Sequence, residues 1–204
     1  MNAEVQPPLL LGARVRLRAM QARDVPALFG VYSDPVVMRY WSFPPFERVE
    51  QAQELFDNND RGGRAGEFLP WAIALHPPSA STADALIGTC SLFAIDTTHR
   101  RAMIGYALAR AHWGAGYAQE ALRLALAHAF GTLALNRVEA DVDPRNTASL
   151  RLLERVGFTH EGVMRERWRV GDDVQDSAMY GLLARDHAAA ASTPVAERKA
   201  TGAT

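Results

Sequence analysis

One stretch near the middle of the 204-residue chain constrains the fold more than any other. Residues 103–109 have the composition of a β-strand, and residues 117–130 carry apolar side chains at helical spacing. Between them, Gly114 and Gly116 flank one alanine and permit a tight turn that opens directly into the helix. A strand that turns at once into a helix predicts a protein of the mixed α/β class.

The rest of the chain supplies further strands and helices of the same kind. Strands are expected at residues 14–19, 68–75, 86–95, 103–109, 137–142, 162–170 and 174–183. Helices are expected at 24–32, at 47–59 with Gly62, Gly63 and Gly66 ending that stretch, at 117–130, and at 146–156 with Gly157 as its cap. The helix between the fourth and fifth strands permits one parallel pair, and the other connections favour antiparallel pairing. We therefore predict a single mixed, mostly antiparallel sheet of seven strands with about four helices.

Composition excludes several classes of protein. The chain has 22 basic and 23 acidic residues, so it lacks the basic excess of a general nucleic-acid binder. Its one cysteine, Cys90, allows no intrachain disulfide, which fits a cytoplasmic location. No apolar run approaches the roughly 20 residues of a membrane span. Residues 187–204 contain no aromatic residue, and we expect them to form a poorly ordered tail.

The turn at residues 114–116 has the features of an anion site. The first amides of a helix lack internal partners and carry the positive end of the helix dipole, so they can hold a phosphate or pyrophosphate. The alternative is a tight turn before a packed helix. The sequence has no nucleotide P-loop, and Gln119 stands where a dinucleotide fingerprint has its third glycine.

A second informative segment follows about thirty residues later. Asn146 stands where a helix cap is expected, and Ser149 lies one turn further along the same face. Taken alone, Asn146 fits a purely structural cap and Ser149 an ordinary exposed serine.

Together the segments resemble the GNAT acetyltransferase superfamily, and within it the RimJ/RimL-type branch of protein N-terminal alanine acetyltransferases. The likeness extends over about residues 9–185, so we expect one GNAT domain at residues 9–186. GNAT proteins have a sheet with a splayed central strand pair. The motifs that carry the resemblance are Trp113–Ala121, Asn146-x-x-Ser149, Gly157-Phe158-x-x-Glu161-Gly162, Asp34–Trp41 and Asp176–Tyr180.

The resemblance implies acetyl-CoA as co-substrate, with no metal. Loop amides would bind its pyrophosphate, at Trp113, Gly114, Ala115, Gly116, Tyr117, Ala118 and Gln119. The preceding strand, at Tyr106, Ala107 and Leu108, would pair its backbone with the pantetheine arm and hold the thioester. Asn146 would hydrogen-bond that arm, and Ser149 would protonate the leaving thiolate.

The sequence departs from the family pattern at three positions. Ala111 replaces a Gln or Arg that often contributes a side chain to the loop. Leu153 occupies the place of a tyrosine acid, and Trp168 that of a glutamate suggested as base in some relatives. Glu166 lies two residues earlier and would share a strand face with that position, so it is our candidate base. The alternative for Glu166 is a solvated surface charge.

The acceptor is an amine. By family resemblance it is the α-amine of a protein N-terminus, and a small-molecule amine is the alternative. Tyr40, Trp41 and Phe46 would form a wall of the acceptor pocket or pack in the core. A non-catalytic acyl-CoA-binding protein and a longer acyl donor stay open. Since dimers are the commonest assemblies, a homodimer is the oligomer to consider.

Overall fold

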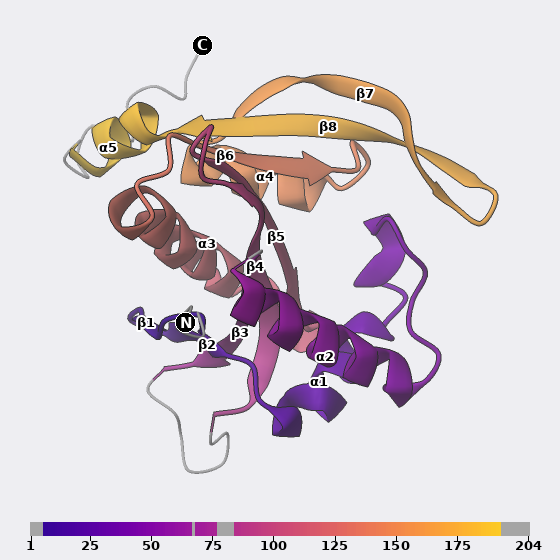
Figure 1. The fold of residues 1–204 in the computed structure, drawn as a ribbon. Helices are drawn as coiled ribbons and strands as arrows, with labels where there is room; N and C mark the ends of the chain where they lie inside the picture. The colour runs from indigo at the N-terminus through magenta and orange to yellow at the C-terminus, as the bar shows by residue number, and fades with distance from the viewer. Residues whose placement is uncertain (1–5, 67, 77–83, 193–204) are drawn as a thin grey trace.

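The computed structural model describes residues 6–66, 68–76 and 84–192, which form one mixed α/β fold (Figure 1). Its single sheet has eight strands in the order β1-β2-β3-β4-β5-β6-β8-β7, and only the β5–β6 pair is parallel. The strands are β1 (Leu10–Leu11), β2 (Val15–Ala19), β3 (Leu69–Leu75), β4 (Leu86–Asp96), β5 (Arg101–Leu108), β6 (Arg137–Val142), β7 (Thr159–Val170) and β8 (Asp173–Leu183). The expected GNAT-type fold class is confirmed, with the short β1 as an eighth strand.

Helices connect the strands on both sides of the sheet. The α-helices are α1 (Val25–Tyr32), α2 (Val49–Ala65), α3 (Tyr117–Ala127), α4 (Thr147–Val156) and α5 (Ala184–Ser192). Short 3₁₀ turns precede α1 and α3, and a π-turn continues α3 to Thr132. None of the described helices combines the length and the apolar character that a membrane crossing requires. The cytoplasmic location and the homodimer stay predictions.

Helix α2 runs past the two glycines that were expected to end it. Gly62 and Gly63 are buried inside the helix, and α2 ends at Gly66 in the left-handed conformation. A β-carbon at Gly62 would overlap the ring of Phe68, whereas one at Gly63 would lie in ordinary contact with Pro70, at 3.5 Å. Gly62 thus serves the close packing of α2 on Phe68, a demand that helix propensity alone does not reveal.

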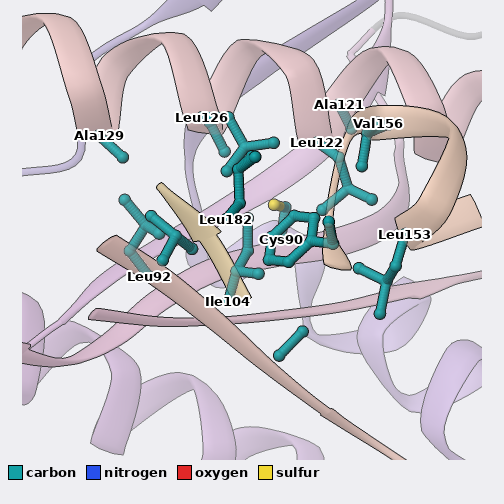
Figure 2. Close-up of a cluster of buried hydrophobic side chains, with 14 of the residues drawn as sticks. Cys90, Leu92, Ile104, Ala121, Leu122, Leu126, Ala129, Leu153, Val156 and Leu182 are labelled. Atoms are coloured by element: carbon teal, nitrogen blue, oxygen red, sulfur yellow. The ribbon is translucent and has the colours of Figure 1, made fainter. Parts of the chain in front are cut away.

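Two apolar cores lie on the two faces of the sheet. The larger joins β4, β5 and β8 to α3 and α4; in Figure 2, Leu122 and Leu126 of α3 point toward the side chains of the sheet. Cys90 is fully buried there, and burial raises the pKa of its thiol to about 12. The second core joins α1 and α2 to the other face, which includes Ala72 and Ala107.

The C-terminal segment begins as a helix. Helix α5 begins before His187 and continues to Ser192, and the His187 ring lies 5.0 Å from that of Phe130, centroid to centroid. Residues 187–192 are helical in the structure, and the poorly ordered tail stays a prediction. Residues 193–204 lie outside the described part of the chain.

Candidate active site

The parallel pair at the centre of the sheet opens into a gap. Strands β5 and β6 pair only from Arg101 to Met103 on β5 and from Arg137 to Glu139 on β6. Beyond that point β5 stays paired with β4 as far as Leu108, whereas β6 stays paired with β8 as far as Val142. The two strands therefore diverge, and the inner edge of β5 after Met103 has no strand partner in the described part of the chain.

The backbone of β5 presents polar groups to this gap. The amide of Ala109 donates to the carbonyl of Ile87 on β4 at 2.9 Å. Because hydrogen bonds alternate along an antiparallel pair, Tyr106 and Leu108 direct their N–H and C=O groups away from β4. Ala107 directs its own groups toward β4, so this member of the expected pantetheine-binding trio offers no free backbone group.

The loop after β5 leads directly into α3. Gly114 and Gly116 have φ angles of +74° and +80°, which L-residues rarely adopt, and Gly116 is the N-cap of α3. The first amides of α3 therefore have the orientation of an anion site. The Trp113 indole N–H donates to the carbonyl of Leu108 at 2.7 Å, so the tryptophan anchors the loop to the end of β5.

One residue that the sequence did not single out contacts this loop from a distant part of the chain. Arg14, just before β2, donates to the carbonyl of Ala115 at 2.8 Å and pairs with Glu120 of α3 at 3.0 Å. They are more than 100 positions apart, and no local motif indicates such a contact.

Ser149 and Asn146 lie on the α4 side of the gap. The Ser149 hydroxyl lies 2.6 Å from the Tyr106 hydroxyl, so a hydrogen bond links α4 to β5. Burial raises the pKa of Tyr106 to about 12, and the phenol stays protonated at neutral pH. The side-chain oxygen of Asn146 accepts from the Ser149 amide at 3.2 Å, so Asn146 caps α4 as predicted. Whether its NH₂ group also contacts a ligand is a separate prediction.

The cap and the predicted ligand contact of Asn146 can be separated by mutation. Asn146→Asp should change the free energy of unfolding by less than about 0.5 kcal/mol, because Asp and Asn cap comparably. It removes the NH₂ donors, so CoA should bind about 10-fold more weakly in calorimetry. Asn58→Asp, an exposed change on α2 with the same added charge, is the control. Unchanged CoA affinity in Asn146→Asp would leave Asn146 with a structural role only.

A cavity of about 260 Å³ opens on the α1–α2 face of the sheet beside β5. Gly105 forms part of its wall, so no side chain at this position separates the cavity from the β5 backbone. Tyr32 lines it too, with its hydroxyl 2.9 Å from that of Thr89, and burial raises the pKa of Tyr32 to about 12. The lining residues are Met20, Tyr32, Trp41, Leu55, Asn59, Phe68, Thr89, Ser91, Phe93, Gly105 and Tyr106. This lining contains no carboxylate, histidine or lysine.

The three predicted acceptor residues take different places. Trp41 lines the cavity, edge-on to Tyr32 at a centroid distance of 5.3 Å. Phe46 stacks on Tyr32 at 5.4 Å and packs against the second core, so it supports the wall from behind. The ring of Tyr40 lies 5.5 Å from the guanidinium of Arg39 and is absent from the lining.

The strand alternation that suggested Glu166 as base is interrupted in β7. The β7–β8 register jumps from Met164↔Ser177 to Trp168↔Gln175, so β7 carries a bulge that contains Glu166. Glu166 has a φ of +52° and is exposed, and its amide donates to Asp176 at 2.8 Å. A shared face with position 168 cannot be inferred across a bulge, so the geometry gives Glu166 no catalytic role.

Two further observations concern the tyrosine-acid position and the metal ligands. Leu153, at the position of a tyrosine acid in many relatives, is fully buried in the larger core (Figure 2). Within the described residues, no group of three or more His, Cys, Asp or Glu side chains could hold a metal ion.

Comparisons with known proteins identify the family of the chain. Residues 14–159 match the acetyltransferase (GNAT) domain family. The uncharacterised N-acetyltransferase p20 of Bacillus licheniformis is 36% identical over 175 residues, which cover 86% of this chain and 96% of that protein. A spermidine N(1)-acetyltransferase of Vibrio cholerae is 25% identical over 176 residues, 86% of this chain and 96% of the relative. The structure of Mycobacterium smegmatis RimJ in complex with CoA-disulfide superposes with a TM-score of 0.75 at 24% identity, covering 91% and 95% of the two chains.

The divergent β5–β6 pair and the glycine loop before α3 fit an acyltransferase that takes its acyl group from a CoA thioester. The chain belongs to the GNAT family, and it is an acetyl-CoA-dependent N-acetyltransferase.

Proposed function

We propose that this N-acetyltransferase acts on the α-amino group of a protein or peptide N-terminus, as the RimJ/RimL-type branch does. The observation that carries the proposal is the cavity beside Gly105, whose described lining offers no carboxylate or histidine as a base. Burial raises the pKa of Tyr32, and of Tyr106, which also contributes to the lining, to about 12, so neither phenol is a base at neutral pH. The acceptor amine must therefore arrive neutral or lose its proton to water.

This requirement selects among amines. An α-amino group has a pKa near 8, whereas a lysine side chain has one of about 10.4. At neutral pH the neutral fraction of the α-amine is therefore about 300-fold larger. The walls formed by Trp41, Phe68 and Phe93 suit a compact, apolar first side chain.

A polyamine is the second candidate, because a Vibrio cholerae relative is named a spermidine N(1)-acetyltransferase. Spermidine carries several positive charges at neutral pH, and desolvating them without nearby carboxylates is unfavourable. The absence of carboxylates from the described cavity lining therefore favours the α-amine.

The remaining residues have roles on the thiol side of the reaction. The acceptor nitrogen attacks the thioester carbonyl, the C–S bond breaks, and the sulfur requires a proton. We assign that proton to the Ser149 hydroxyl, since Tyr106 can donate to Ser149 and so leave the serine hydrogen free for the sulfur. Asn146 and the amides of Tyr106 and Leu108 would hold the pantetheine arm.

A panel of acceptors tests the proposal by the rate of CoA release. Short peptides with a free N-terminal Ala or Ser should give the highest kcat/KM, and the rate should rise with pH as the α-amine loses its proton near pH 8. Nα-acetylated lysine peptides and spermidine should react at least about 100-fold more slowly, in line with their smaller neutral fraction. A higher kcat/KM for spermidine would transfer the proposal to polyamines.

A further inference from the structure

Arg14 lies against the proposed diphosphate-binding loop from outside it. Its backbone amide and that of Val15 donate to Oε1 of Glu120 at 2.7 and 3.2 Å, and its Nε donates to Oε2 at 3.0 Å. The carboxylate of Glu120 therefore joins the start of β2 to the first turn of α3.

This anchoring places the Arg14 guanidinium at the turn itself. Nη1 donates to the carbonyl of Ala115 at 2.8 Å. Nη2 lies 3.2 Å from the position that a β-carbon at Gly116 would occupy, and the guanidinium lies 5.4 Å from the centre of the Tyr117 ring. The absence of a side chain at Gly116 thus lets the cation approach the N-cap of α3.

Arg14 compensates the negative charge of Glu120 at the start of α3. Burial raises the pKa of Glu120, but the hydrogen bonds from Arg14 and Val15 outweigh burial and hold that pKa below its usual value. Glu120 is therefore an anion in the first turn of α3, where it would repel a bound diphosphate. Its pairing with Arg14 cancels this charge, and the guanidinium, about half exposed, keeps N–H donors for a ligand.

We propose that Arg14 binds the diphosphate of acetyl-CoA. From its place just before β2, Arg14 supplies to the loop the polar side chain that Ala111 does not provide. Arginine suits this place because its planar group can donate to the Ala115 carbonyl and to a phosphate oxygen at once. The inference rests on the proposed role of the glycine loop and is independent of the acceptor.

Ligand truncation tests this role. In Arg14→Ala the Kd for CoA should rise by about 10- to 100-fold in calorimetry, the loss expected for a hydrogen bond between charged groups. The Kd for dephospho-CoA, which keeps the diphosphate, should rise by the same factor. Pantetheine, which ends before the diphosphate, should bind the variant and the unmodified protein alike in an NMR titration. Arg14→Lys keeps the positive charge but loses the planar guanidinium. Its Kd for CoA should lie between those of Arg14→Ala and the unmodified protein.

Three outcomes would overturn the assignment. Unchanged CoA affinity in a folded Arg14→Ala would remove Arg14 from the site. Equal losses for CoA and pantetheine would indicate a general distortion, as would an equal loss in Arg23→Ala, which removes another exposed arginine paired with a carboxylate. If Arg14→Ala does not fold, the affinities of Arg14→Lys decide by the same comparison. Since no acceptor is present, failure here leaves the α-amine proposal intact, and Gly116→Trp in the same assay tells whether the loop itself is the site.

Discussion

Gly116→Trp is expected to abolish CoA binding while the fold persists. The indole would occupy the space where the loop amides meet the ligand, and its β-carbon would lie 3.2 Å from Nη2 of Arg14. The Kd should rise about 100-fold or more, because two lost hydrogen bonds to a charged group, at about 1.5–3 kcal/mol each, account for such a change. Calorimetry with CoA measures this, and circular dichroism checks the fold.

A matched substitution separates this effect from backbone strain. Gly171, at the β7–β8 turn, also has a positive φ, of +59°, and open space around it. Gly171→Trp therefore carries a similar strain of about 1–2 kcal/mol but should leave CoA affinity unchanged. If a folded Gly116→Trp binds CoA normally, the loop is not the diphosphate site.

Gly105→Leu is expected to abolish acetyl transfer without weakening CoA binding. The leucine side chain would enter the 260 Å³ cavity at the point where it reaches the β5 backbone. Its β-carbon would lie 3.2 Å from the Phe93 ring, which is 36% exposed and can shift. We expect kcat/KM for the acceptor to fall about 100-fold or more, the order of effect of misplacing a reacting group by about 1 Å.

Two controls accompany Gly105→Leu: a smaller side chain at the same position, and the CoA affinity of each variant. Gly105→Ala should give an intermediate loss, and both variants should keep the CoA affinity of the unmodified protein. Gly131→Leu, at an exposed glycine with open space around it, should leave both quantities unchanged. Normal turnover in Gly105→Leu would show that the acceptor does not enter through this cavity.

The predictable part of the site is the part encoded locally. The glycine loop and the Asn146 cap each depend on residues within about one helical turn, so the local sequence indicated both the turn and the cap. The seven main strands also followed from local patterns, either period-two alternation or runs of β-forming residues between turn signals.

The rest depends on contacts between distant segments or on irregular backbone. Arg14 meets Glu120 only because β2 lies beside α3, and the cavity gathers residues from Met20 to Tyr106. The inference about Glu166 failed because the bulge in β7 breaks the alternation on which it rested. Gly62 was misread as a helix end because its partner, Phe68, approaches only in the folded chain.

One peptide with two amines tests the central claim most directly. A short peptide with a free N-terminal Ala and one internal lysine is incubated with the enzyme and acetyl-CoA at pH 7, and tandem mass spectrometry locates the acetyl group. We expect acetylation of the α-amine, with the lysine essentially unmodified, because the two amines differ about 300-fold in neutral fraction. An acetyl group on the lysine, or an untouched peptide under conditions in which spermidine is acetylated, would contradict it.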